Sequence, residues 1–416
     1  MRPRCRGLTM TDGGSMGTIG VPSGDELLQP ADVVIIGGGV IGVATAFWAG
    51  RAGLRVVCLE RRDGLGTLTT ALSEECFRAQ FTEPANIRMM KASIEFFERF
   101  AEMTGLEDCD LGLKQQGYLF VSGAEDGPRV LRERVELQRQ HGLDDVEYLD
   151  GDEVRRRFPF IGPRATAGTF RARDGWLSTH ALTYGLARAT AGGRFWLRTE
   201  ATGLVVDGRG VCGVETNRGR IATRRVVLAT GPFAAVTAAR FGATVPVTAV
   251  RRHKVVITGY PEIPQAAPMT IDDATGAYWR PESGGAALGW ALPEPPMEPR
   301  EVVPTDWTFP AVVLEAVSEL SPFWEGIATR LHREQVYLSA GQYPCTPDNN
   351  PVIDAYDPIP GLYLNIGYGG HGIMASPEGG RLLAELLIGR APAEVEPFRL
   401  SRFSADRQAA RESMVI

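Results

Sequence analysis

Histidine and cysteine are scarce in this chain of 416 residues, and their arrangement excludes several kinds of site. The 5 histidines are scattered, and the 6 cysteines contain no C-x-x-C pair. Neither set has the spacing of metal ligands, so we expect no metal site. Isolated thiols are typical of a reducing compartment rather than of a disulfide framework. We therefore expect a cytoplasmic protein.

Charge of one sign and long apolar runs are also lacking. The net charge is −6, with basic residues spread along the chain, which argues against a nucleic-acid or anionic-membrane partner. Residues 33–50 carry no charge, but five of them are glycines. That composition predicts a strand, a turn and a helix rather than a membrane span. A G-x-S-x-G nucleophile motif and a phosphate-binding G-x-x-x-x-G-K motif are both missing.

The first 30 residues are polar and glycine-rich and have no hydrophobic periodicity. We expect residues 1–30 to form a disordered tail without the apolar core of a signal peptide. The remaining length exceeds what one hydrophobic core normally holds, so two lobes are expected.

A glycine-rich motif follows the tail. Gly37, Gly39 and Gly42 have G-x-G-x-x-G spacing between a predicted strand, Val33–Ile36, and a predicted helix over 41–52. In such a turn the first glycine permits the tight bend, the second lets a pyrophosphate approach, and the third allows close helix–strand packing. A second strand, 55–59, ends at Glu60, where an acidic side chain binds ribose hydroxyls. The unit predicts a dinucleotide site and disfavours NADP.

Two later segments favour FAD over NAD. The sequence after Glu60, "RRDGLGTLTTALSEECFRAQF", is a Gly- and Thr-rich loop that can follow a phosphate–ribityl chain. The predicted strand 226–229 ends in Ala-Thr-Gly, which suits a second backbone approach to the same cofactor.

A second glycine turn lies near the C-terminus. The segment "GYGGHG", residues 367–372, holds four glycines and one histidine. Ser376, Pro377 and Glu378 have the order of an N-cap, a first-turn proline and a first-turn acid, which predicts a helix start. Leu382, Leu383, Leu386 and Leu387 would form its buried stripe. The alternative is a glycine C-cap or tight hairpin with an incidental histidine.

With these motifs in place, the chain resembles the DAO-type FAD-dependent oxidoreductases, which include D-amino-acid oxidase, glycine oxidase, sarcosine oxidase and dimethylglycine dehydrogenase. The similarity runs from Asp32 to Phe398. It rests on "SEECFRAQF", "YWRPESGGAALG", "TPDNNPVI" and "GYGGHGIMASPEGGRLLAELLIG" in this order. The last two most resemble the sarcosine oxidase and dimethylglycine dehydrogenase branch.

The resemblance implies an α/β fold in which a Rossmann-like FAD-binding lobe is interleaved with an α+β substrate-binding lobe. We assign 31–77, 150–243 and 335–400 to the first lobe, and 78–149 and 244–334 to the second. Residues 401–416 are a C-terminal extension. Six prolines between Pro293 and Pro310 indicate a loop, either a lid or a surface connection.

The resemblance also implies that the C-terminal turn lies against the flavin ring. The expected cofactor-binding residues are Gly37, Gly39, Val40, Ile41, Gly42, Glu60, Arg61, Arg62, Thr69, Thr70, Ala201, Gly231, Gly341, Gly370, His371, Gly372, Ile373 and Met374. Some relatives attach FAD covalently through a histidine or a cysteine. Residues 61–75 contain no histidine, and the cysteine position aligns with Gly341 rather than Cys345. We expect non-covalent FAD.

The implied chemistry is oxidation of an amine or amino acid to an imine, with hydride transfer to flavin N5 and oxygen or another electron acceptor to reoxidise the flavin. Arg78 is the expected ligand of a substrate carboxylate; the alternative is a surface or ion-pairing arginine. Tyr343 and Arg280 are candidates for the pocket wall. Two lysines of relatives are missing, one replaced by Met374 and one from the strand "AALGW". A flavin-bearing subunit of a larger complex and an FAD monooxygenase using NAD(P)H remain alternatives.

Overall fold

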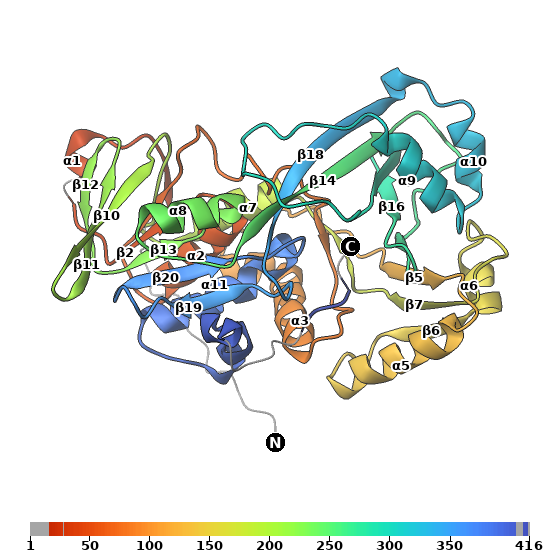
Figure 1. Ribbon diagram of the computed structural model, residues 1–416, viewed down its shortest axis with the longest axis horizontal. Helices are drawn as coiled ribbons and strands as arrows, with labels where there is room; N and C mark the ends of the chain where they lie inside the picture. Colours follow the sequence, from red (N-terminus) through yellow and green to blue (C-terminus); the bar gives the residue numbers. More distant parts are fainter. Residues whose placement is uncertain (1–15, 28, 405–410, 415–416) are drawn as a thin grey trace.

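The computed structural model describes residues 16–27, 29–404 and 411–414. One lobe is built on a seven-stranded sheet in which all neighbouring pairs are parallel except the last, β20–β19 (Figure 1). The strand order is β1 (Thr18–Gly20), β9 (Arg194–Trp196), β3 (Val56–Leu59), β2 (Val33–Ile36), β13 (Val226–Leu228), β20 (Leu362–Ile366) and β19 (Val352–Ala355).

Both faces of this sheet are covered, which explains why its strands are continuous apolar runs. Val33 and Ile35 of β2 belong to one core cluster, and Val34 and Ile36 belong to another. The first cluster contains α2 (Val40–Arg51), α3 (Pro84–Glu98), α7 (Thr179–Ala189) and α11 (Gly372–Leu387). The second contains α8 (Ala234–Arg240) and the three-stranded sheet of β10 (Ala201–Asp207), β11 (Gly210–Thr216) and β12 (Gly219–Ala222).

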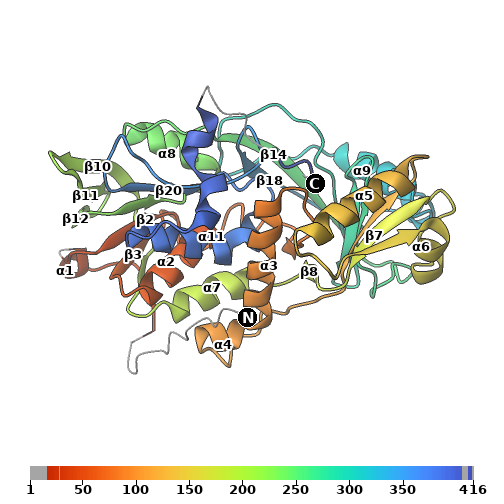
Figure 2. The same cartoon turned by 90° about the horizontal axis from the view of Figure 1, so that it is seen from below.

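The other lobe is built on an eight-stranded sheet, which is antiparallel apart from the pair β15–β5. Figure 2 shows this lobe beside the first. Its strand order is β18 (Val336–Cys345), β14 (Thr248–Ile257), β17 (Gly285–Gly289), β16 (Tyr278–Glu282), β15 (Met269–Asp272), β5 (Tyr118–Ser122), β7 (Ala167–Arg171) and β6 (Glu147–Asp150). Its helices are α5 (Gly127–Gln140), α6 (Gly151–Arg157), α9 (Phe309–Ser318) and α10 (Phe323–Ala328).

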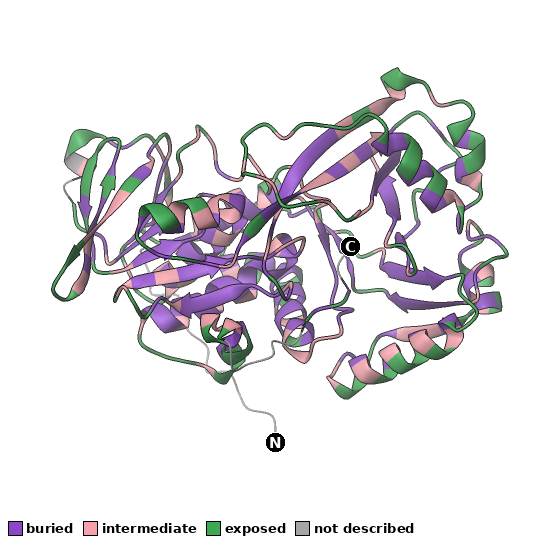
Figure 3. Cartoon of the chain, in the orientation of Figure 1, coloured by how far each residue is buried: buried purple, intermediate pink, exposed green. Residues whose placement is uncertain are grey.

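The smaller elements are α1 (Gly24–Leu27), α4 (Phe100–Thr104) and the pair β4 (Cys76–Phe77) with β8 (Gly175–Trp176). Short 3₁₀ helices lie at Gly231–Phe233, Arg333–Gln335, Ala393–Phe398 and Leu400–Phe403. The strands of both large sheets are mostly buried, and α5 exposes its outer face (Figure 3). Among the described residues, no helix is both long and apolar enough to cross a bilayer.

The predicted α/β fold with two interleaved lobes is confirmed, but the sheets do not follow the predicted segment boundaries. β7 and β18 were expected in the FAD-binding lobe and lie in the eight-stranded sheet. The predicted disordered tail is wrong for residues 18–20, because β1 pairs with β9 through backbone hydrogen bonds that need no side-chain pattern. The part of the predicted tail before residue 16 lies outside the described residues.

Gly380 allows α11 and α2 to pack closely. A Cβ atom built on Gly380 would lie 2.7 Å from the carbonyl carbon of Ala44 and 2.9 Å from the backbone nitrogen of Thr45. Both are backbone atoms of α2, so a side chain at this position would force the helices apart.

Gly380→Val should therefore lower the free energy of unfolding by about 3 kcal/mol, as overpacking of a buried contact does. The measurement is urea denaturation followed by circular dichroism. Gly326→Ala in α10 is the control, because a Cβ there has its nearest neighbour at 4.0 Å. It should change stability by less than about 1 kcal/mol. Equal stability of the two variants would contradict the close approach of α2 and α11.

Candidate functional site

One cavity lies where the parallel strands β2, β3, β13 and β20 end, and it extends to the eight-stranded sheet. It brings together seventeen of the eighteen residues expected to bind the cofactor, from segments up to 337 positions apart (37 to 374). The exception is Gly42, which does not line the cavity. A Cβ on Gly42 would lie 1.9 Å from the carbonyl oxygen of Gly37, so this glycine serves packing inside the turn.

The first glycine turn presents backbone at the cavity. Gly37 has a φ of 111°, and a Cβ there would lie 2.3 Å from the carbonyl oxygen of Ala229. Gly39 caps α2 without a side-chain hydrogen bond. The N–H of Val40 donates to Thr70 Oγ1 at 3.3 Å, which ties the Thr-rich loop to the start of the helix. A helix N-terminus open to a cavity is an anion-binding feature.

Glu60 joins the two turns that follow β2 and β3. Its Oε2 accepts a hydrogen bond from the N–H of Gly38, and its Oε1 accepts one from the N–H of Arg62, both at 2.9 Å. Each carboxylate oxygen keeps a further lone pair for a hydroxyl donor. The acid is therefore fixed beside the glycine turn, as the sequence predicts.

The proline-rich segment 293–310 lies along the cavity edge. Glu301 forms ion pairs of 2.9 Å with Arg61 and with Arg62. The N–H of Arg300 donates to Gln342 Oε1 at 2.8 Å, and the N–H of Asp306 donates to His253 Nε2 at 3.0 Å. The segment thus contacts cavity-lining residues of both sheets, and its role as a lid stays a prediction.

The second glycine turn leads directly into α11, which begins at Gly372. The predicted N-cap at Ser376 is wrong, because Ser376 and Pro377 lie inside the helix. Pro377 has no N–H to donate to the carbonyl of Ile373, and the hydroxyl of Ser376 donates to that carbonyl instead, at 2.9 Å. The helix can therefore begin earlier and direct the N–H groups of residues 372–374 at the cavity.

His371 precedes this helix and is 6% exposed. Its ring meets Phe81 edge-on, with 4.9 Å between ring centroids, and its Nε2 has no hydrogen-bond partner among the described residues. Burial is the main cause that lowers the pKa of His371 well below its usual range, and the positive charge of Arg78 lowers it further. The imidazole is neutral at neutral pH.

Arg78 lines the cavity and is fully buried, so the alternative of a surface arginine is wrong. Its guanidinium donates to the backbone carbonyls of Gln80 and Met414 and lies 3.9 Å from the ring centroid of Phe81. Its Nε has no hydrogen-bond partner and the guanidinium forms no ion pair within the part of the chain that the structure describes, although the charges of Glu412 and Asp174 act on it. A buried guanidinium without a carboxylate is costly and favours an anionic ligand.

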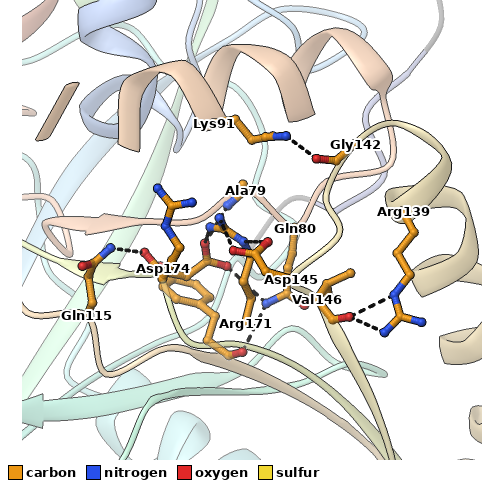
Figure 4. A network of polar contacts seen from close by, with 12 residues as sticks. Ala79, Gln80, Lys91, Gln115, Arg139, Gly142, Asp145, Val146, Arg171 and Asp174 are labelled. Atoms are coloured by element: carbon orange, nitrogen blue, oxygen red, sulfur yellow. Dashed lines mark hydrogen bonds and ion pairs between the residues drawn. The ribbon is translucent and has the colours of Figure 1, made fainter. Parts of the chain in front are cut away.

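A buried polar network holds the segment that carries Arg78 (Figure 4). Asp174 accepts hydrogen bonds from the N–H of Ala79 at 3.0 Å and from Gln80 Nε2 at 3.3 Å. Arg171 pairs with Asp174 and, through Nε at 2.7 Å, with Asp145. The segment is therefore fixed to β7 and β8 on one side and contacts the cavity on the other.

The two wall candidates have different positions. Tyr343 lines the cavity beside the second glycine turn, where a Cβ on Gly370 would lie 2.6 Å from its Cε2. Arg280 does not line the cavity, which corrects its expected place in the wall. Its guanidinium turns to Glu282 and donates from Nε to the carbonyl of Glu74 at 3.1 Å.

Sequence reasoning missed an ionisable group in the cavity. Glu74 lines it, and Lys254 Nζ lies 4.0 Å from Glu74 Oε2. The hydroxyl of Tyr278 lies 3.4 Å from Glu74 Oε1. Burial raises the pKa of Glu74, although the charges of Lys254 and Arg280 oppose this. The sequence signal that could have identified Glu74 was its position four residues before Arg78 in "SEECFRAQF".

Comparison with known proteins agrees with this geometry. The FAD dependent oxidoreductase family, DAO, matches residues 32–386. The chain belongs to this family. It is 28% identical to "FAD-dependent oxidoreductase domain-containing protein 1" of Xenopus laevis, over 95% of this chain and 86% of the relative. It is also 28% identical to glycine oxidase of Geobacillus kaustophilus, over 89% and 97% of the two chains.

Solved structures show the same fold. L-proline dehydrogenase from P. horikoshii has a TM-score of 0.81 at 26% identity and covers 92% of this chain and 100% of its own. Glycine oxidase from Geobacillus kaustophilus has a TM-score of 0.77 at 26% identity, covering 90% and 99%. The protein is therefore an FAD-dependent oxidoreductase of the DAO family.

The lowered pKa of His371 predicts a pH dependence of stability. Between the folded pKa and the unfolded value near 6.5, the unfolded chain binds the extra proton, so stability is present above about pH 6.5 and is lost as the pH falls. From about pH 7 to pH 5, wild-type apoprotein should lose up to about 2 kcal/mol more unfolding free energy than His371→Gln. Urea denaturation at both pH values measures this. The exposed His180, changed to Gln, is the control; if His371→Gln keeps the wild-type pH profile, the imidazole is not held neutral.

Proposed function

We propose that this protein oxidises the C–N bond of an amino acid or of a secondary or N-methylated amine to an imine, with FAD bound non-covalently in the cavity. The observation that carries this proposal is the position of Arg78. Arg78 lines the same cavity as the two glycine turns, and its buried guanidinium has no ion-pair partner among the described residues. An anionic substrate group is its fitting partner.

The residues present fit FAD. The turn at Gly37 and the start of α2 offer N–H groups for the pyrophosphate, and Glu60 offers carboxylate oxygens for ribose hydroxyls. At the other turn, a Cβ on Gly372 would meet only Tyr368 Cβ, at 3.6 Å, so this glycine leaves room for a ring. The first N–H groups of α11 would stabilise negative charge on that ring. Bound FAD supplies a hydride acceptor at N5.

Two features support non-covalent binding. Cys345 does not line the cavity. Cys76 does, but burial raises the pKa of its thiol to about 11, and its Sγ donates to the carbonyl of Glu74 at 3.1 Å. A buried, protonated thiol is a poor nucleophile.

The substrate's carboxylate would bind Arg78, and this contact would place its amine against the flavin face. The tyrosine rings of residues 118, 278 and 343 line the same cavity and exclude water from it. Several relatives bear names with substrates of this type: glycine oxidase, sarcosine oxidase subunit beta and 4-methylaminobutanoate oxidase. The protein's part in the reaction is then to orient the amine and to leave it neutral beside a hydride acceptor.

The test is an anaerobic spectral titration of the holoprotein with N-methyl, cyclic and D-amino acids and with amines lacking a carboxylate. A carboxylate-bearing amine should bleach the flavin without NAD(P)H. Arg78→Ala should lower kcat/KM for that substrate by about a hundredfold or more, because losing one partner of a desolvated charge pair costs ~2–5 kcal/mol. Amines without a carboxylate should change far less.

Arg129→Ala is the control, because Arg129 is an exposed arginine whose ion pairs lie within and beside α5. Reduction by NAD(P)H alone would favour a monooxygenase, and failure of every amine to reduce the flavin would refute the proposed oxidation. An equal loss of kcat/KM in Arg78→Ala for substrates with and without a carboxylate would show that Arg78 does not bind the carboxylate.

A further inference from the structure

The C-terminal segment Arg411–Met414 packs against the segment that carries Arg78. Glu412 is fully buried, and Met414 is 7% exposed. The N–H of Glu412 donates to the carbonyl of Asp348 at 3.1 Å, and Asn349 Nδ2 donates to the carbonyl of Glu412 at 3.1 Å. The segment is thus held on both its backbone edges.

Glu412 anchors the segment with its carboxylate. Oε1 accepts hydrogen bonds from the N–H of Thr82 at 3.3 Å, from the hydroxyl of Thr82 at 2.7 Å and from the N–H of Met414 at 2.9 Å. Oε2 accepts from the N–H of Glu83 at 3.1 Å and from Asn86 Nδ2 at 3.0 Å. All five of these groups donate hydrogen bonds to the same carboxylate, so this position requires a side chain that only accepts hydrogen bonds.

The ionised state of Glu412 follows from the same contacts. Burial by itself raises the pKa of this carboxyl, but the hydrogen bonds from Asn86, Met414, Thr82 and Glu83 outweigh burial and lower it. The anchor is therefore charged although it is buried, whereas the preceding residue, Arg411, is exposed.

Met414 packs against residues of the cavity wall without lining the cavity itself. Its side chain belongs to a core cluster with Cys76, Tyr118, Met269 and Tyr278, all four of which line the cavity. Its carbonyl accepts a hydrogen bond from Arg78 Nη2. The last described residues of the chain therefore contact both the apolar wall and the charged group of the site.

The two carbonyls on Arg78 fix the rotation of its guanidinium. Nη1 donates to Gln80, Nη2 donates to Met414, and Phe81 covers one face of the group. Nε has no partner among the described residues, and Nη2 has a second hydrogen. Nε is thus the unused donor of the group, and the edge of Nε and Nη2 has the geometry to donate two parallel hydrogen bonds to a carboxylate.

We propose that the segment Arg411–Met414 is part of the substrate site, where Glu412 and the Met414 carbonyl position the Arg78 guanidinium for a carboxylate ligand. This inference rests on the proposed function in one respect, the role of Arg78. Glu412 acts through Met414 and is a positioning residue. The C-terminal extension then determines specificity for carboxylate-bearing ligands, since a guanidinium free to rotate would present no fixed pair of donors.

The test uses the holoenzyme and two small probes, anthranilate and its carboxylate-free analogue aniline, with each Kd taken from the perturbation of the flavin absorbance. Glu412→Ala should raise the Kd of anthranilate about tenfold and leave that of aniline unchanged. Glu412→Gln should raise the Kd of anthranilate about threefold, because one oxygen still accepts hydrogen bonds while the new amide opposes two donors. Glu396→Ala is the control, since Glu396 is a 64% exposed glutamate near the C-terminus.

Should Glu412→Ala yield no soluble holoprotein, Glu412→Gln alone carries the test. The inference would be overturned if the Kd of anthranilate did not change, or if aniline lost as much affinity as anthranilate. A lower Kd of anthranilate would also overturn it and would show that Met414 competes with the ligand. Failure of wild-type protein to bind anthranilate would overturn it as well. Glu412-dependent binding in a protein that no amine reduces would retain this inference and refute the proposed oxidation.

Discussion

The parallel pairing of β2 with β13 and of β13 with β20 is the constraint on which the site depends. It brings the carboxyl ends of β2 and β20 to one edge of the sheet, so the turn at Gly37 and the turn at Gly370 meet although 333 positions separate them in the sequence. Two helices leave this edge, and the close contact of α2 with Gly380 of α11 fixes their relative position. Each turn then offers a helix N-terminus to the same cavity.

The electrostatics of the cavity follow from burial. Arg78 keeps a charge without a carboxylate partner in the described structure, and His371 beside it is neutral. Glu74 and Lys254 lie in the same cavity, with 4.0 Å between Glu74 Oε2 and Lys254 Nζ, so each has a partner of the opposite kind. Arg78 therefore lacks a directly paired carboxylate, although the charges of Glu412 and Asp174 act on it, and this fits the recognition of an anionic group more directly than any apolar feature of the wall does.

Local motifs predicted the geometry around the Gly37 turn well, because its contacts are close in sequence. Gly37, Gly42 and Glu60 have the spatial relations that their spacing indicates. The start of α11 was misplaced, because a serine hydroxyl compensates for Pro377 inside the helix. Arg280 was misassigned because its strand position does not reveal that its guanidinium turns to Glu282. The contact of Met414 with Arg78 joins residues 336 positions apart and has no signal in either segment.

The central claim is that the C-terminal glycine turn contacts FAD, and Gly372→Val tests it most directly. A Cβ at Gly372 meets protein only at Tyr368 Cβ, 3.6 Å away, so the valine should leave the unfolding free energy of the apoprotein within about 1 kcal/mol of wild type. Titration of FAD into apoprotein, followed by flavin fluorescence, should show at least about tenfold weaker binding, since the branched side chain would occupy space meant for the ring. Gly203→Val, at a position of β10 that does not line the cavity and where a Cβ meets Glu215 Cβ at 3.7 Å, should bind FAD as the wild type does. Wild-type affinity in Gly372→Val would contradict the account.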